Sequence, residues 1–249
     1  MENDLLVSVI TVSFNSGATI ARTIESVLRQ SYRRIEYIVL DGGSSDNSVS
    51  ILNNAEQKFQ GRMKWRSESD GGMYDAMNKG IALASGELIG ILNSDDWYEP
   101  DAVETIVDAF QNDGDAIYYG LMKVYDKEQS VLVRGVHHSR LGEENINHPA
   151  CFVPKALYQR HGTFDLAYRS AADYDLMLRF LKQGVKFVSI DKIIANFALG
   201  GLTTIERDFG IIESYAIRKK YGFISPGRAW WEVLKIRLKA SLRRIGIRL

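Results

Sequence analysis

Two adjacent carboxylates, Asp95 and Asp96, come directly after an apolar run that predicts a strand from Leu88 to Leu92. Like charges side by side repel each other, and ending a strand does not require both of them. Carboxylate oxygens are hard ligands that suit Mg²⁺ or Mn²⁺, and Mg²⁺ is typically held by one or two carboxylates together with substrate phosphates. The pair therefore predicts a divalent cation that links the protein to a diphosphate.

Two other polar clusters also follow apolar runs that predict strands. Phe14 and Asn15 follow the run from Leu6 to Val12, and a turn that is rich in Gly, Ser and Asp follows Leu40. In an open α/β sheet, ligands bind beyond the carboxyl ends of the strands, so we expect all three clusters in one crevice. The alternative is that Asp41 and Asp95 are ordinary turn or helix-capping residues.

The turn "DGGSSD" excludes two nucleotide-binding motifs. It lacks the lysine of a Walker phosphate loop and the G-x-G-x-x-G pattern of a dinucleotide-binding turn. The sequence therefore predicts neither ATP hydrolysis nor a nicotinamide cofactor.

Alternating elements are expected to position these clusters. Strand-like and helix-like runs alternate four times between Leu6 and Gln111 with short links, which predicts a parallel sheet covered by helices on both faces. After Gly114, residues 116–126 and 130–136 predict an antiparallel pair, residues 172–183 a helix, and residues 186–198 one or two further strands. The predicted fold class is α/β.

Length and composition limit the kind of protein. The chain has 249 residues, of which 45% are hydrophobic and 25% charged, enough for one large domain or two small ones. Lone Cys151 excludes an internal disulfide and fits a reducing compartment. We expect no signal peptide in the first residues, and no apolar run approaches the roughly 20 residues that span a bilayer.

The charge is unevenly distributed along the chain. Residues 218–249 contain ten Lys or Arg and one acid, Glu232, a net charge of +9 in a chain whose total is zero. This predicts a catalytic domain over residues 1–217 and a basic tail over 218–249 with an anionic partner, either a membrane or a nucleic acid.

The tail pattern favours the membrane. On a helix drawn from residue 230 onward, bulky apolar residues share one side and basic residues adjoin it, as in helices that lie in a membrane interface. The alternative is that the helix packs on the catalytic domain. The apolar residues are Trp230, Trp231, Leu234, Leu238, Leu242, Ile245 and Leu249, and the basic ones are Lys235, Lys239 and Arg243.

Three stretches together resemble a known family. They are "SVITVSFNSGATIARTIESVLRQSYRRIEYIVLDGGSSDNS", "SDGGMYDAMNKGIALASGELIGILNSDDWY" and "NHPACFVPKALYQRHGTFDLAYRSAADYDLMLRFLKQG". Over about residues 6–205 the chain resembles the family 2 glycosyltransferases of GT-A fold, in particular bacterial exopolysaccharide and lipopolysaccharide transferases of the colanic-acid type. The resemblance implies inverting transfer of a sugar from a nucleoside diphosphate to an acceptor hydroxyl.

The resemblance also implies a nucleotide site. Residues 12–14, with Val12 and Phe14, would line the base pocket, and Asp41 would bond the base, often uracil. Asp70 and the helix that ends at Lys79 would flank the ribose and diphosphate. Asp41 is followed by Gly42, where many members of the family have a second acid.

The resemblance further implies the metal ligands. Asp95 and Asp96 would be the metal-binding pair, with Asp95 beside the nucleotide and Asp96 in direct contact with Mg²⁺ or Mn²⁺. Asn93 stands where a first acid could extend this motif.

Asp173 would be the catalytic base, with Ala172 at a position where the family often has Glu. The alternative is a capping box, because Ser170 stands three residues before this acid at a helix start. Asp175 is a weaker candidate for the base. His148 would line the acceptor pocket, or it is a loop histidine satisfied by the backbone.

These expectations define partners and a location. The donor would be a nucleoside-diphosphate sugar, with UDP favoured over GDP, and the acceptor a glycan or a lipid-linked glycan. We expect a cytoplasmic protein on the inner face of the membrane, where its tail binds anionic lipid. We expect no nucleic acid among its partners. The rival hypothesis is a binding module of the same fold without catalysis. A nucleotidyltransferase is disfavoured because no Lys or Arg follows the first strand until Arg22.

Overall fold

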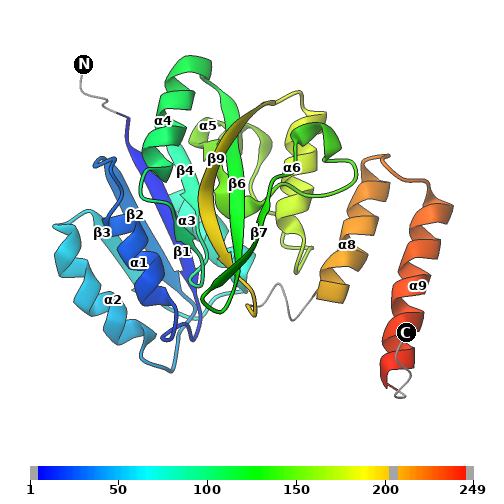
Figure 1. The fold of residues 1–249 in the computed structure, drawn as a ribbon, viewed down its shortest axis with the longest axis horizontal. Helices are drawn as coiled ribbons and strands as arrows, with labels where there is room; N and C mark the ends of the chain where they lie inside the picture. The colour runs from blue at the N-terminus through cyan, green and yellow to red at the C-terminus, as the bar shows by residue number, and fades with distance from the viewer. Residues whose placement is uncertain (1–4, 202–206, 245–249) are drawn as a thin grey trace.

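The computed structural model describes residues 5–201 and 207–244, and for residues 207 and 240–244 it describes the backbone alone. Within these ranges the strands form one nine-stranded sheet with the order β3-β2-β1-β4-β8-β6-β9-β5, and β7 pairs with β6 (Figure 1). Mixed strand and helix confirm the predicted α/β class.

Four parallel strands form the first half of the sheet. They are β1 (Val7–Ser13), β2 (Ile35–Asp41), β3 (Met63–Ser67) and β4 (Leu88–Ile91). β1, β2 and β4 are buried along their whole length, which explains why they are apolar runs rich in Val and Ile. Ser13 is opposite Asp41 and Ile10 is opposite Ile91, so the carboxyl ends of the three strands share one edge.

The second half of the sheet contains both pairing directions. β8 (Cys151–Pro154) is antiparallel to β4 and to β6 (Ala116–Asp126), whereas β9 (Lys186–Ala198) is parallel to β6. β5 (Trp97–Tyr98) is antiparallel to β9, and β7 (Gln129–Arg134) is antiparallel to β6. The predicted antiparallel pair is therefore confirmed, and residues 186–198 form one long strand.

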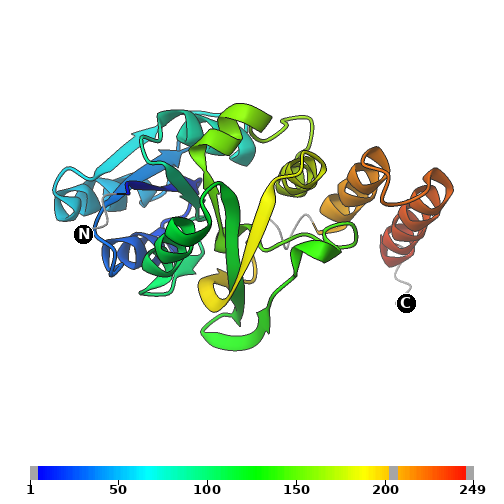
Figure 2. The same cartoon turned by 90° about the horizontal axis from the view of Figure 1, so that it is seen from above.

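Helices cover both faces of the sheet (Figure 2). α1 (Ile20–Leu28), α2 (Ser48–Glu56) and α4 (Ala102–Asp113) share one core with the side chains of one face. α3 (Met73–Leu83), α5 (Lys155–His161) and α6 (Ala172–Lys182) share a second core on the other face. Short 3₁₀ turns are η1 (Gln57–Phe59), η2 (His138–Arg140) and η3 (His148–Ala150).

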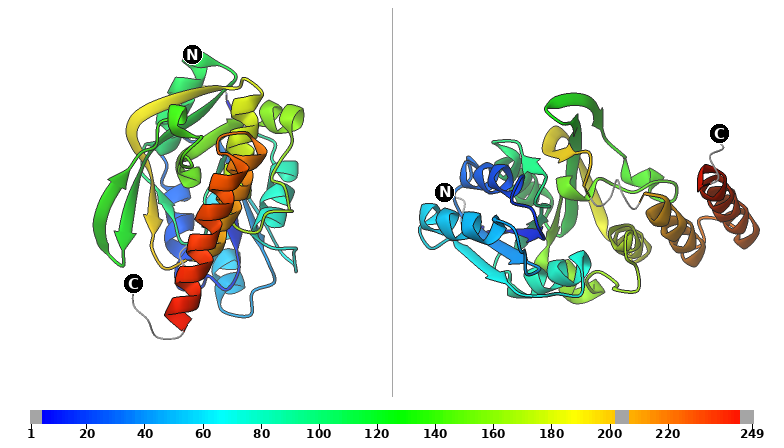
Figure 3. Two further views of the ribbon diagram at one scale, coloured as in Figure 1. Left: turned by 90° about the vertical axis from the view of Figure 1, so that its right-hand side faces the viewer. Right: turned by 90° about the horizontal axis from the view of Figure 1, so that it is seen from below.

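Two C-terminal helices extend this body at one end. α8 (Arg207–Lys220) packs against α6, and α9 (Pro226–Arg244) packs against α8 as the outermost element (Figures 1 and 3). The domain boundary predicted between residues 217 and 218 falls inside α8. The basic tail therefore begins within a helix and not at a link between two elements. None of the described helices is both long and apolar enough to span a bilayer.

Candidate active site

Hydrogen bonds join the loops that follow β1, β2 and β4 at the carboxyl edge of the sheet. The N–H of Asn15 donates to Ser44 Oγ at 2.7 Å, which ties the loop after β1 to the loop after β2. Ser16 Oγ and Ser94 Oγ lie 2.6 Å apart, which ties the loop after β1 to the loop after β4. The structure thus brings the three polar clusters of the sequence to one edge.

An exposed aromatic ring and a carboxylate lie together at this edge. Phe14 is 64% exposed, whereas Val12 is 7% exposed and packs in the core, so Val12 supports this surface rather than lining it. A Cβ atom added to Gly42 would lie 2.9 Å from Asp70 Oδ2 and 3.4 Å from the Phe14 ring. Phe14 and Asp70 therefore both lie beside Gly42, which has no side chain, and a flat base could stack on the exposed Phe14 ring.

Asp41 is buried beneath this surface and already has its partners. Its side chain accepts hydrogen bonds from the Ser44 N–H at 2.9 Å, from Ser44 Oγ at 2.5 Å and from Ser67 Oγ at 2.7 Å. The residue is 2% exposed. These contacts are those of a turn residue, because they fix the start of the Gly/Ser/Asp turn and the end of β3.

Asp70 lies just before α3, and Lys79 lies within this helix. Asp70 Oδ1 accepts a hydrogen bond from the Gly72 N–H at 2.8 Å, just before the helix begins. Lys79 forms an ion pair with Asp75 at 3.0 Å, and the hydrogen bond with Asp75 raises the pKa of Lys79. Lys79 therefore remains a cation on the exposed side of this helix.

The two carboxylates after β4 have different surroundings. Asp96 is fully buried, its Oδ1 accepts the Ala198 N–H at 3.1 Å, and its Oδ2 accepts the Asn93 side-chain amide at 3.2 Å. Asp95 is partly exposed, and its Oδ2 would lie 2.2 Å from a Cβ added to Gly201. Asp96 therefore links the loop after β4 to the end of β9, while Asp95 lies against Gly201.

Burial and mutual repulsion disfavour the ionised forms of Asp95 and Asp96. Burial, and then the neighbouring charge of Asp95, raises the pKa of Asp96 well above its usual range. Burial also raises the pKa of Asp95. A cation at this point would oppose both effects, because its positive charge favours the ionised carboxylates, as the charge of Arg22 already does for Asp96.

Asp173 lies in the first turn of α6 and is held by two neutral donors. Its Oδ1 accepts the Tyr74 hydroxyl at 3.1 Å, and its Oδ2 accepts the Asn145 side-chain amide at 2.7 Å. Among the described residues, no cation forms an ion pair with this carboxylate. A carboxylate that is fixed in this way, but not neutralised, can still accept a proton.

Comparison with known proteins identifies the family. The model of the family described as glycosyl transferase family 2 matches residues 8–172. An uncharacterised glycosyltransferase of Mycobacterium tuberculosis is 39% identical over 180 residues, which cover 70% of this chain and 68% of that protein. The chain belongs to the family 2 glycosyltransferases.

Solved structures with low sequence identity share the GT-A fold of this glycosyltransferase. S. aureus TarS (residues 1–349) in complex with UDP-GlcNAc has a TM-score of 0.74 at 15% identity, over 98% of this chain and 77% of that one. A mannosyltransferase from Pyrobaculum calidifontis in complex with GDP-Man and Mn²⁺ has a TM-score of 0.70 at 15% identity, over 98% and 76%. The expected GT-A fold is confirmed.

The structure does not support the capping-box interpretation of Asp173 or the choice of Asp175 as the base. The helix has Ala171 as its N-cap without a side-chain capping bond, so Ser170 and Asp173 do not form a capping box. Asp175 is buried and pairs with Lys220 of α8 at 2.8 Å. Asp175 therefore ties two helices together, and Asp173 is the carboxylate whose partners leave it able to act as a base.

His148 is partly buried at the start of η3. Its ring packs edge-on against Phe164 with centroids 5.6 Å apart, and burial lowers its pKa while the charge of Asp173 opposes this. Burial, and then the charge of Asp173, raises the pKa of Cys151. A role of His148 in the acceptor pocket stays a prediction.

The oxygen ligands that this glycosyltransferase offers fit a divalent cation that the protein and a substrate phosphate bind together. In the described part of the chain, no group of three or more His, Cys, Asp or Glu side chains could enclose a metal. The partly exposed carboxylate of Asp95, next to buried Asp96, fits the sites in which Mg²⁺ also takes phosphate oxygens. Asn93 Oδ1 is buried without a hydrogen-bond partner beside them, a further hard oxygen.

Sequence reasoning did not identify two residues that hold Asp173. Asn145 lies in an irregular loop whose pattern carries no signal, and it reaches Asp173 only through the tertiary fold. Tyr74 was expected to flank the donor as part of its helix, yet its hydroxyl points to Asp173. Neither contact follows from local periodicity, because 99 and 28 residues separate the partners.

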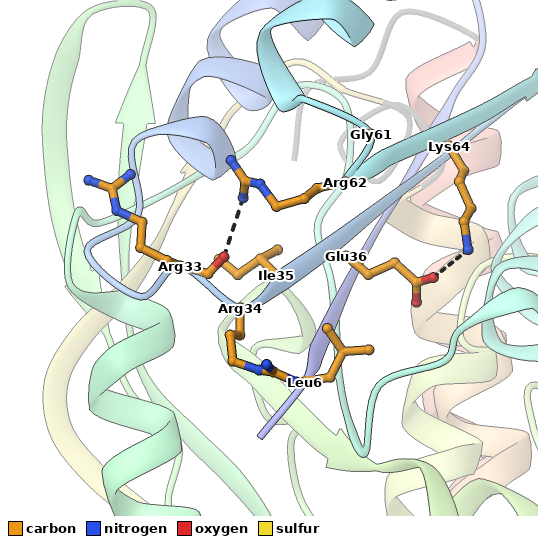
Figure 4. Close-up of a pocket in the computed structure, with 8 residues that line it drawn as sticks. All are labelled: Leu6, Arg33, Arg34, Ile35, Glu36, Gly61, Arg62 and Lys64. Carbon is orange, nitrogen blue, oxygen red and sulfur yellow. Dashed lines mark hydrogen bonds and ion pairs between the residues drawn. The ribbon is translucent and has the colours of Figure 1, made fainter. Parts of the chain in front are cut away.

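A cavity lined by several basic residues lies at the amino ends of the strands. It has a volume of about 330 Å³ and is formed where β1, β2 and β3 begin (Figure 4). Lys64 points to Glu36 at 2.8 Å and Arg62 to the Arg33 carbonyl at 3.5 Å. The candidate site is at the opposite ends of these strands, so this cavity is not part of it.

Proposed function

We propose that this glycosyltransferase transfers a sugar, with inversion, from a UDP-sugar to a hydroxyl of a glycan or lipid-linked acceptor in bacterial surface polysaccharide synthesis. The observation that carries the proposal is the Asp173 carboxylate, which two neutral donors fix without neutralising it. On the donor side, the proposal is supported by the exposed Phe14 ring, by Asp70 beside Gly42 and by the carboxylates after β4.

The reaction follows from these groups. Asp173 accepts the proton of the acceptor hydroxyl while that oxygen bonds to the anomeric carbon, and the bond from this carbon to the nucleoside diphosphate breaks. Tyr74 and Asn145 orient the carboxylate throughout. A divalent cation, when bound, supplies Lewis-acid stabilisation of the diphosphate that leaves.

For the direct metal ligand, we propose Asp95 in place of Asp96. The sequence favoured Asp96, but both of its oxygens accept hydrogen bonds from Ala198 and Asn93 and its side chain is fully buried. Asp95 is partly exposed at the same edge. Asp96 then acts as a buried charge that fixes β9 behind the metal.

A screen of donors tests the proposal. The purified chain is incubated with a panel of UDP- and GDP-sugars, Mg²⁺ or Mn²⁺ and glycan acceptors, and release of nucleoside diphosphate is measured. We expect release with a UDP-sugar that depends on the metal and on the acceptor. Binding of nucleotides without release under any of these conditions would instead support a binding module.

We also propose that α9 holds the protein to the inner face of the cytoplasmic membrane. Trp230 and Trp231 are 65% and 54% exposed on this outermost helix, and Leu238 is exposed as well. The predicted Leu242 side chain, Ile245 and Leu249 lie outside the described residues. A large exposed aromatic surface beside basic side chains is typical of interfacial helices.

A further inference from the structure

A carboxylate on α8 holds the segment that leads into α6. Glu213 Oε2 accepts the backbone N–H groups of Ser170 at 2.8 Å and Ala171 at 2.9 Å, and Glu213 Oε1 accepts that of Arg169 at 2.9 Å. Hydrogen bonds to an ionised acceptor are stronger than neutral ones. α6 has no side-chain cap, and Glu213 places a negative charge at its positive end by holding the N-cap residue Ala171 and the two residues before it.

The packing of α8 is adapted to this contact. Gly210 lies one helical turn before Glu213, and a Cβ added to it would lie 3.2 Å from Ser170 Oγ. A glycine here allows α8 to approach the segment closely enough for Glu213 to reach three successive N–H groups. Further along the same helix, Lys220 pairs with Asp175 at 2.8 Å, so α6 is fixed to α8 at two levels.

The held segment ends two residues before Asp173. The oxygens of Asp173 meet Tyr74 of α3 and Asn145 of a separate loop, so a small shift of the first turn of α6 would break one contact or both. A displacement of about 1 Å of a reacting group can cost on the order of 10²-fold in rate. The location of this turn therefore sets the geometry of the base.

We propose that Glu213 is a positioning residue for sugar transfer, which holds residues 169–171 and thereby places the Asp173 carboxylate. The inference rests on the proposed function of Asp173. Glu213 lies beyond residues 8–172, which the family model matches, so the inference adds α8 to the elements that transfer needs.

The test compares Glu213→Ala and Glu213→Gln with Lys219→Ala, a change on the exposed surface of the same helix. We measure kcat and the donor KM with the donor that the screen identifies, together with hydrogen exchange of the amides of residues 169–175. For Glu213→Ala we expect a fall in kcat of about 10-fold or more, because the base is misplaced. The donor KM should not change, and residues 169–171 should exchange faster.

The conservative variant distinguishes positioning from stability alone. Glu213→Gln keeps one carbonyl oxygen and should restore part of kcat, and Lys219→Ala should match the parent. A lower Tm with unchanged kcat for Glu213→Ala would overturn the inference and leave the proposed function intact, as would unchanged exchange at residues 169–171. A parent chain without transfer activity on any donor would overturn both.

Discussion

At the scale of single residues, Asp95 and Asp96 are neighbours that differ in exposure and in hydrogen bonding. Burial and the neighbouring charge of Asp95 raise the pKa of Asp96, while the hydrogen bonds that it accepts from the Ala198 N–H and the Asn93 amide lower it. Asp95 is partly exposed at the same end of the sheet. Asp96 thus holds the end of β9 in place, and Asp95 is the metal ligand that we propose.

This difference predicts the effects of two matched substitutions. Asp95→Asn should weaken Mn²⁺ binding in the presence of UDP by at least about 10-fold, since a charged ligand is lost, and should leave Tm nearly unchanged. Asp96→Asn should instead leave Mn²⁺ binding nearly unchanged, because its amide oxygen can still accept the Ala198 N–H and its amide nitrogen can donate to Asn93 Oδ1 once the Asn93 amide turns. Titration calorimetry and thermal unfolding check both results. Loss of Mn²⁺ binding only in Asp96→Asn would show that Asp96 is the direct ligand.

The sequence could predict which residue types gather at the site, but not the partners of each side chain. Three polar clusters at strand ends follow from the rule for open α/β sheets, and the structure joins them. Whether Asp41 faces a ligand or its own turn depends on Ser44 and Ser67, and the latter belongs to a different strand. Such contacts depend on tertiary placement rather than on local spacing.

At the scale of elements, local periodicity predicts the first half of the fold well. The expected helix over residues 74–84 is α3, and the strand over 87–92 is β4. The position of β8 between β4 and β6 could not be predicted, because it is set by pairing across long separations. α8 was not predicted either, because its apolar residues follow a weak pattern.

The packing of α3 on β1 gives a prediction on stability. A Cβ added to Gly80 would lie 2.5 Å from Ile10 Cγ2, so Gly80→Ala should destabilise the protein by about 1–3 kcal/mol through overpacking. Gly227→Ala is the matched control, because it makes the same change near the start of α9 with no atom within 4 Å. The control should be neutral or slightly stabilising. Urea unfolding of both variants measures the difference, and equal stabilities would contradict this account of the packing.

At the scale of the whole molecule, the C-terminal helices connect the catalytic body to the proposed membrane contact. α8 joins α6 through Glu213 and Lys220, and α9 packs on α8 at the end of the molecule (Figure 3). The sequence predicted the basic tail from its charge. It did not predict that the residues just before the tail hold the helix of Asp173, because this is a tertiary contact.

The membrane proposal predicts binding to anionic liposomes at low salt and release at high salt, since each basic residue near such a surface contributes about 1 kcal/mol and salt screens the attraction. Trp230→Ser with Trp231→Ser should reduce co-sedimentation strongly. Val131→Ser, at an exposed apolar residue of β7, is the control and should not. If the parent stayed in the supernatant at low salt, α9 would have another partner.

The most direct test of the central claim is the turnover of Asp173→Asn. Asparagine keeps the shape and can still accept from Asn145 and donate to Tyr74, but it cannot take the acceptor proton. With Asp191→Asn, an exposed residue of β9, as the control, we expect kcat to fall at least about 10²-fold with donor binding unchanged. Turnover of Asp173→Asn equal to that of the parent would contradict the assignment of the base, and with it this account of transfer.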